Sequence, residues 1–242
     1  MEMLIENHAI NEGLGDILKK SSQLMANKGF YGTSMRDLAK ATGRSLSGLY
    51  HYFRSKEDLL YLINYCGFSQ LLKTLDGQKK VIEKPEENLY GAIYLHVYFF
   101  IHHMDEMRIM CLGTHSLAYE RAKTIRELKS QYTALVSGII NAAYDSQTHA
   151  PLPEDELARK TFLLFGMMNW IFSWYSEEKY GSADQLADDC YLTFTQGVFG
   201  GRAALAGLPG RDQIAAKIRS AITPDESGGE DCSPEQNLKP AN

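Results

Sequence analysis

The chain has few cysteines, and their positions argue against several kinds of site. Its 242 residues include four, Cys66, Cys111, Cys190 and Cys232, with no C-x-x-C pair and no cysteine and histidine spacing typical of zinc. We therefore expect reduced, mostly structural thiols and no metal.

Long hydrophobic runs and a secretion signal are also missing. The longest apolar stretch, residues 92–101, is interrupted by His96 and is much shorter than the roughly 20 residues that cross a bilayer. The first ten residues, MEMLIENHAI, are acidic and lack the positively charged and then apolar order of a secretory signal. We therefore expect a cytoplasmic protein that does not enter a membrane.

Sequence motifs for catalysis are missing as well. The chain contains neither a G-x-S-x-G nucleophile motif nor a G-x-x-x-x-G-K phosphate loop. Histidines and acids crowd one region without an H-x-x-x-H or E-x-x-H pair that would suit a metal. These residues are His96, His102, His103, Asp105, Glu106 and His115. The chain is therefore predicted not to be an enzyme.

Acidic residues are nearly absent between residues 19 and 56, where the chain is basic. This segment holds eight basic residues and one acid, Asp37, and carries +7, whereas the net charge of the whole chain is −5. The remaining residues therefore carry −12, so the positive charge is a local patch. Such a patch is typical of a surface that binds nucleic acid.

The basic segment contains the signals of a short helix. Ser34 followed by Asp37 predicts a helix over residues 35–42, with the serine as its N-cap. Gly43 is suited to end this helix, because glycine readily takes the left-handed conformation. A tight turn is therefore expected directly after residue 42.

Two further helix starts follow closely. Ser45 predicts a second short helix that runs to Tyr52, and Ser55 begins a third helix that runs to about Lys79. Another helix is expected over residues 11–28. Two short helices joined by a tight turn predict a helix-turn-helix that binds DNA.

The motifs of this segment occur in a defined order. The chain reads T-S-M-R-D-L-A, then G-x-S-x-S-G-L-Y-H-Y-F, and then S-K-E-D-L-L. This order, over about residues 10–63, closely resembles the N-terminal domain of TetR-type transcriptional regulators. The resemblance implies a repressor that binds a palindromic operator in double-stranded DNA as a homodimer and is released by a small effector.

The resemblance also assigns residues of this chain to DNA contacts. Leu46, Ser47 and Gly48 would lie nearest the bases. Many relatives carry a polar residue in place of Leu46, so its contact would be apolar, for example with a thymine methyl group. The residues expected to contact mostly phosphates are Thr33, Ser34, Arg36, Ser45, Tyr50, His51 and Lys56, and Arg44 is a further residue expected to bind DNA.

From residue 59 onwards, apolar residues recur with helical spacing, and no segment alternates like a strand. We therefore predict an all-α fold with a three-helix helix-turn-helix domain over residues 1–62 and a six-helix effector-binding and dimerisation domain over 63–208. The six helices are expected over residues 56–79, 85–104, 105–115, 117–145, 153–178 and 183–206. Residues 209–242, rich in Pro, Gly, Ser and acids, are predicted to be a largely disordered acidic tail with a short helix near 211–222.

The last two helices of the second domain are predicted to form the dimer interface. They carry more apolar residues, on more than one side, than a lone outer helix needs. These residues are Leu163, Leu164, Met167, Met168, Ile171, Leu192, Phe194, Val198 and Phe199. The alternative is that they pack only within their own domain.

Two groups of aromatic and methionine residues predict an effector pocket, with ordinary core packing as the alternative for each residue. The groups are His96, Phe99, Phe100, Met104, Met107 and Met110, and Asn169, Trp170, Trp174 and Tyr175. The run F-G-M-M-N-W-I-F-S-W-Y-S-E, at residues 165–177, resembles the corresponding helix of TetR-type regulators of fatty-acid, sterol or aromatic-acid degradation. This resemblance implies an acyl-coenzyme A effector, and no cofactor is expected.

The phosphates of coenzyme A would require basic partners. The candidates are Arg108, Arg121, Lys123 and Arg126, with ordinary solvated charges as the alternative. A second function within the same family is a multidrug sensor that controls an efflux gene and binds hydrophobic cations. Such a sensor would need acids beside its aromatics, for which Glu177 and Glu178 are the candidates.

Overall fold

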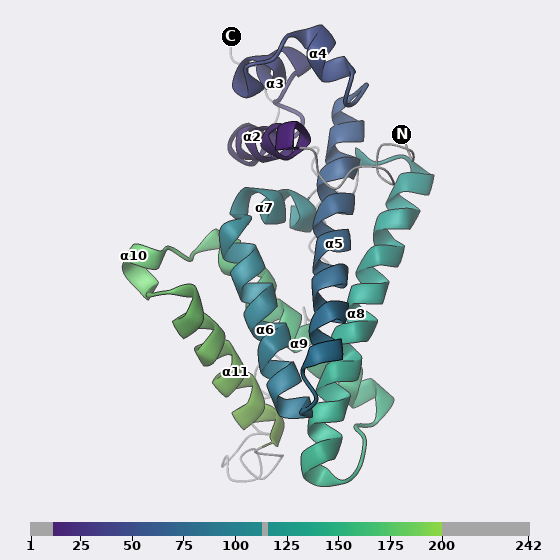
Figure 1. Cartoon of the computed structure of the whole chain (residues 1–242), viewed down its shortest axis with the longest axis vertical. Coiled ribbons are helices and arrows are strands. Elements are labelled where there is room, and N and C mark those ends of the chain that lie inside the picture. The colour runs from purple at the N-terminus through teal and green to yellow at the C-terminus, as the bar shows by residue number, and fades with distance from the viewer. Residues whose placement is uncertain (1–11, 113–115, 200–242) are drawn as a thin grey trace, which may run out of the picture. The chain divides into compact units, whose positions relative to one another are not determined.

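The computed structural model describes residues 12–112 and 116–199, and every regular element in these ranges is helical (Figure 1). The predicted all-α fold is therefore confirmed. The helices of the first part are α2 (Glu12–Lys28), α3 (Met35–Thr42), α4 (Leu46–Tyr50) and α5 (Lys56–Val81). The others are α6 (Pro85–His102), α7 (Met104–Leu112), α8 (Tyr119–Thr148), α9 (Glu154–Asn169), η2 (Ile171–Ser173), α10 (Glu177–Tyr180) and α11 (Ala183–Phe199).

The helix-turn-helix is held by a small apolar core. Leu38 of α3, Leu49 of α4 and Phe53 after α4 are at most 1% exposed and pack with Ile17 of α2 and Leu59 of α5. Burying each of these side chains contributes roughly 1.5–3 kcal/mol of hydrophobic free energy, an upper value because the unfolded chain is itself partly compact. This core fixes the two short helices against the long α5.

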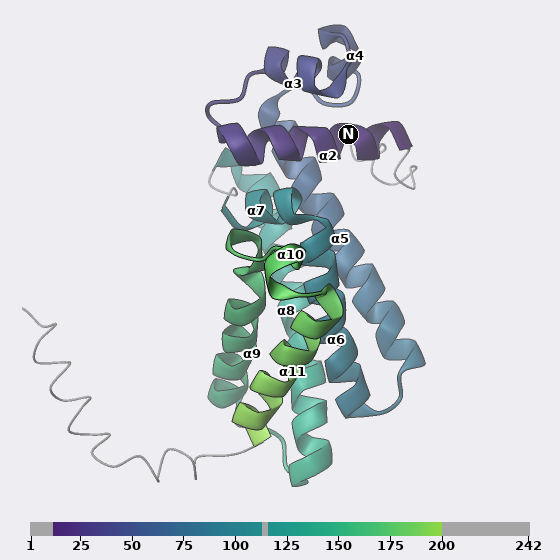
Figure 2. The ribbon, with the colours of Figure 1, turned by 90° about the vertical axis from the view of Figure 1, so that its left-hand side faces the viewer.

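A second apolar core joins the C-terminal half of α5 to α6, α8, α9 and α11. Leu75, Ile93, Val97, Ile139 and Leu164 are each at most 2% exposed within it. Figures 1 and 2 show α5 running from the helix-turn-helix into this bundle. Since α5 continues unbroken through residues 62 and 63, the two predicted domains share one helix.

α7 is short and lies between α2 and the bundle (Figures 1 and 2). Met107 and Met110 of α7 are 1% and 2% exposed and belong to the same core as Ile17 and Leu18 of α2. α7 therefore connects α2, which supports the helix-turn-helix, with the helical bundle.

The helix predicted over residues 153–178 is wrong, because α9 ends at Asn169. Trp170 has φ −90° and ψ −3°, and its carbonyl accepts the Ser173 N–H at 3.0 Å and the Ser173 hydroxyl at 2.8 Å. These hydrogen bonds form a tight turn, in which Ile171 and Phe172 are buried. α10 then follows as a separate short helix.

The other helix ends differ less from the predictions. The second short helix ends at Tyr50 and not at Tyr52, α6 ends at His102 and not at residue 104, and α8 extends to Thr148. The predicted ends at residues 115 and 206, the short helix near 211–222 and the C-terminal tail lie outside the described residues. Among the helices that the structure describes, none is long and apolar enough to cross a membrane.

Candidate DNA-binding surface and effector cavity

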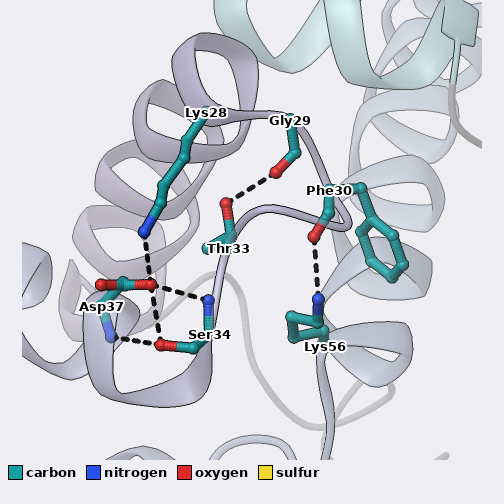
Figure 3. A network of polar contacts seen from close by, with 7 residues as sticks. All are labelled: Lys28, Gly29, Phe30, Thr33, Ser34, Asp37 and Lys56. Atoms are coloured by element: carbon teal, nitrogen blue, oxygen red, sulfur yellow. Dashed lines mark hydrogen bonds and ion pairs between the residues drawn. The ribbon is translucent and has the colours of Figure 1, made fainter. Parts of the chain in front are cut away.

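The start of α3 is fixed by a network of polar contacts (Figure 3). The Ser34 N–H and hydroxyl donate to Asp37 Oδ2 at 2.9 and 2.7 Å, and the Asp37 N–H donates back to Ser34 Oγ at 3.2 Å. Lys28 Nζ lies 2.8 Å from the same carboxylate oxygen. Hydrogen bonds from Lys28 and Ser34 hold the pKa of Asp37 well below its usual range. The first turn of α3 is therefore held in one orientation.

Two residues expected to contact phosphates instead hold the turn before α3. Thr33 is 2% exposed, and its hydroxyl donates to the Gly29 carbonyl at 2.8 Å. Lys56 Nζ donates to the Phe30 carbonyl at 2.8 Å and lies 4.7 Å from the centre of the Phe30 ring (Figure 3). Burial removes Thr33 from the surface, whereas the half-buried Lys56 keeps part of its side chain in solvent.

α4 presents a polar outer face. Ser45 caps it by accepting the Gly48 N–H at 3.0 Å, and Leu49 points into the core. The exposed residues of this region include Ser45, Ser47, Tyr50 and His51, while Leu46 and Gly48 are partly buried. Gly43 ends α3 with φ 68°, a conformation that a side chain would strain. This turn sets the angle at which α4 leaves α3.

Three exposed cations surround these helices. Arg36 and Lys40 lie one turn apart on α3, and Arg54 follows α4. Lys40 and Arg54 were absent from the predicted contacts, although both are among the eight basic residues of the segment 19–56. Arg44 is partly buried, and its guanidinium lies 5.4 Å from the centre of the Tyr52 ring.

A cavity of about 520 Å³ lies between α5, α6, α7, α8 and α9. Six of the predicted effector residues line it: His96, Phe100, Met107, Met110, Asn169 and Trp170. Residues from both predicted groups therefore line the same cavity. Trp170 is 61% exposed and lies at the edge of the cavity.

The other four predicted effector residues lie outside this cavity. Phe99 lines a separate groove of about 760 Å³ between α5 and α6, and Met104 packs against the bundle core. Tyr175 is buried and donates its hydroxyl to the Gly181 carbonyl at 2.7 Å. Trp174 packs edge-on against Tyr180. The end of α9 at Asn169 explains why Trp174 and Tyr175 do not extend the cavity wall.

Neutral hydrogen-bonding groups form the polar part of the cavity wall. His96 Nε2 lies 3.1 Å from Asn169 Oδ1, and Nδ1 lies 3.0 Å from the Tyr132 hydroxyl. If Nε2–H donates to the Asn169 carbonyl, Nδ1 is the acceptor for the tyrosine. Burial lowers the pKa of His96 to about 3, although the bond to Asn169 opposes this shift. The imidazole is therefore neutral at pH 7.

Several lining residues were not predicted from the sequence. They are Phe68, Leu71, Cys111, Lys129, Tyr132, Thr133, Phe162, Phe165, Gly166 and Phe172. Tyr132, Thr133 and Lys129 come from α8, whose apolar periodicity alone does not show that one of its faces borders a cavity. Only Lys129 among the lining residues carries a charge at pH 7.

The four predicted phosphate partners have different surroundings. Arg121 pairs with Asp58 at 2.5 Å and links α8 to the start of α5. Arg108 donates to the Phe172 carbonyl at 3.3 Å and so lies beside the cavity. Lys123 and Arg126 are exposed on α8. In the part of the chain that the structure describes, no group of three His, Cys, Asp or Glu side chains could hold a metal ion.

A capped helix-turn-helix with exposed cations, joined through the shared helix α5 to a helical bundle, is typical of DNA-binding transcriptional regulators. The family model described as bacterial regulatory proteins of the tetR family matches residues 17–61. A second, described as the tetracyclin repressor-like C-terminal domain, matches residues 83–198. The chain therefore belongs to the TetR family of transcriptional regulators, whose members are DNA-binding regulators and not enzymes.

Solved structures of TetR regulators share this fold. A TetR-family regulator from Bordetella parapertussis is 24% identical, with a TM-score of 0.68 over 74% of this chain and 92% of its own. PfmR from Thermus thermophilus is 25% identical, with a TM-score of 0.66 over 74% and 96%. AibR, solved with isovaleryl coenzyme A and operator DNA, is 25% identical, with a TM-score of 0.63 over 73% and 95%. Among curated protein sequences, none is significantly similar to this chain.

Proposed function

We propose that this protein is a cytoplasmic repressor that binds a palindromic operator as a homodimer and is released when a small effector fills the 520 Å³ cavity. The proposal rests on the position of α7, which packs against α2 and also borders the cavity. Met107 and Met110 line the cavity and belong to the same apolar core as Ile17 of α2. An effector that displaces these two side chains would shift the support of α2, and with it the helix-turn-helix.

Homodimerisation is supported by an exposed apolar strip on α9. Phe162 and Leu163 are 64% and 67% exposed, and Trp170 lies on the same side two turns further on. Leu192 of α11 is 49% exposed. A dimer is required because two DNA-reading heads must lie about 34–36 Å apart to enter successive major grooves.

Several other residues predicted for the interface pack inside their own chain. Leu164, Met168, Ile171 and Phe194 are at most 5% exposed and belong to the bundle core. The side chains of Val198 and Phe199 lie outside the described residues. The proposed interface therefore depends on the outer strip of α9 and on Leu192 of α11.

We infer that α4 approaches the bases and that the exposed cations of α3 contact phosphates. Changing Arg36 or Lys40 to Ala should weaken binding to all DNA sequences alike, because a phosphate contact carries no base information. Each change should also reduce the slope of log affinity against log salt by about 1. Fluorescence anisotropy with the upstream DNA of the protein's own gene would measure both quantities.

Lys79→Ala is the matched control, because Lys79 is an exposed cation in the last turn of α5, at the opposite end of that helix from the helix-turn-helix (Figure 1). It should leave the salt dependence unchanged. A loss confined to one base position, or an unchanged slope in both α3 variants, would contradict the phosphate assignment.

The proposed effector is an acyl-coenzyme A thioester. AibR, which shares the fold, has been solved with such a thioester, isovaleryl coenzyme A, and with its operator. The apolar wall of Phe100, Met107 and Phe165 suits an acyl chain. The multidrug alternative is less well supported, because no acid is found among the residues lining the described cavity and Glu177 and Glu178 lie on the exposed α10.

Release from DNA tests this choice directly. The protein is first footprinted on its own upstream DNA, and acyl-coenzyme A esters, the free acids and cationic dyes are then added in parallel. We expect the esters to release the protein at micromolar concentrations and the dyes to have no effect. Release by the dyes alone would refute the acyl effector and favour the multidrug function.

A further inference from the structure

Lys129 is an unusual residue in the wall of the cavity. It comes from α8, one turn before Tyr132 and Thr133, and lies beside Phe68, Met110 and Cys111 in the cavity wall. Long charged side chains on such a helix normally extend into solvent. Lys129 is instead partly buried, and its ammonium group lies beside the Phe68 ring and the Met110 carbonyl.

The ammonium group has few partners among the described residues. Lys129 Nζ donates to the Met110 carbonyl at 3.4 Å, a long bond, and lies 5.3 Å from the centre of the Phe68 ring. No carboxylate of the described residues lies within ion-pair distance of it. An ammonium group has three N–H donors, so most of its hydrogen-bonding capacity is left for another molecule. Burial accordingly lowers the pKa of Lys129.

The other polar groups of the cavity do not supply a second charge. His96 is neutral and is bonded to both Tyr132 and Asn169. Burial raises the pKa of the Cys111 thiol, although Lys129 opposes the shift, so the thiol is protonated at pH 7. A ligand inside this cavity therefore meets one positive charge, no negative charge, and apolar or neutral surface elsewhere.

We propose that Lys129 anchors the effector, and that the group it binds is an anionic oxygen on an otherwise apolar molecule. This inference rests on the proposed function insofar as the cavity is the effector site. The anionic oxygen is either the carboxylate of a free apolar acid or a phosphate of its coenzyme A thioester. A hydrophobic cation would be repelled by the same ammonium group.

A matched ligand series tests the charge of the bound group. Isothermal titration calorimetry on the DNA-free protein would compare octanoate, octanoyl-coenzyme A, octanamide and octylamine. We expect at least one of the two anions to bind about ten- to a hundredfold more tightly than octanamide, because a hydrogen bond between two charged groups exceeds a neutral one. Octylamine should bind most weakly. Preferred binding of octanoate identifies a carboxylate, and binding of octanoyl-coenzyme A alone identifies a phosphate.

Variants of Lys129 test the residue itself. Lys129→Met keeps the length and apolar stem, and should remove the preference for the anion while leaving octanamide binding unchanged. Lys129→Arg should restore much of the preference, because it keeps the positive charge. Lys73→Met, at an exposed lysine of α5 that does not line this cavity, is the matched control and should behave like the wild type. Circular dichroism would establish that all three variants are folded.

Three results would overturn the proposal: equal binding of the amide and the anions, binding of neither anion to the folded protein, or an unchanged preference in Lys129→Met. Operator binding is measured separately by anisotropy. If Lys129-dependent binding of the anion is seen but the anion does not release the operator, the proposed repressor function fails while the anchoring role stands.

Discussion

Asp58→Ala is expected to lower the free energy of unfolding by about 3 kcal/mol, because it removes both the ion pair between α5 and α8 and the acceptor for the Arg54 N–H at a partly buried site. Asp58 is 7% exposed at the start of α5, and its carboxylate lies 2.5 Å from the Arg121 guanidinium of α8. It also accepts the Arg54 N–H at 2.8 Å. Urea unfolding at pH 7, followed by circular dichroism, would measure the change.

The pH dependence of this effect has a definite sign. Burial opposes ionisation of Asp58, but hydrogen bonds from Arg121 and the Arg54 N–H and the charge of Arg121 together lower its pKa. A lowered folded-state pKa stabilises the protein above the unfolded value of about 3.9. The stability difference between wild type and Asp58→Ala should therefore be full at pH 7 and decrease as the pH falls below about 4.

Asp155→Ala provides the control for this prediction. Asp155 also pairs with an arginine, Arg159, at 2.6 Å, but the pair is exposed on α9. Exposed ion pairs contribute little, so this variant should unfold almost like the wild type. If both variants had equally small effects, the contact between α5 and α8 would not stabilise the fold as we expect.

The parts of the fold that were predicted from the sequence depend on local signals. The capping residues Ser34, Ser45 and Ser55 each bond a backbone N–H three residues later, so the starts of α3, α4 and α5 were predicted correctly. Gly43 likewise ends α3 in the left-handed conformation. Such signals need only a few neighbouring residues, and the sequence displays them directly.

The end of α9 could not be predicted in this way. Helical spacing of apolar residues continues past Trp170, and neither proline nor glycine interrupts it before Gly181. The break arises because Ile171 and Phe172 are buried against other helices after a tight turn. Tertiary packing therefore determines which aromatics reach the cavity, and Trp174 is excluded from it.

The place of Lys129 in the cavity wall likewise could not be predicted from the sequence. When a helix is predicted from the sequence alone, a lysine in it is expected to extend into solvent. Phe68 of α5 and Met110 of α7 approach Lys129 and cover part of its side chain. Contacts between helices far apart in the sequence thus created the one charged position in the cavity wall.

Leu163→Glu should dissociate the proposed dimer and reduce operator affinity by at least a hundredfold. Leu163 is 67% exposed within the apolar strip of α9, and it is not among the residues that line the cavity. A carboxylate buried in an apolar interface without a partner costs several kcal/mol per copy, and a symmetric dimer would bury two. Because the side chain is exposed in the single chain, the monomer itself should fold normally.

Analytical ultracentrifugation and operator anisotropy would separate the two effects. Val81→Glu is the matched control, because Val81 is 79% exposed at the end of α5, away from α9, and should remain dimeric and bind operator like the wild type. A Leu163→Glu protein that stays dimeric would place the interface elsewhere. A monomer that retains full operator affinity would show that one reading head suffices, which the spacing of successive major grooves argues against.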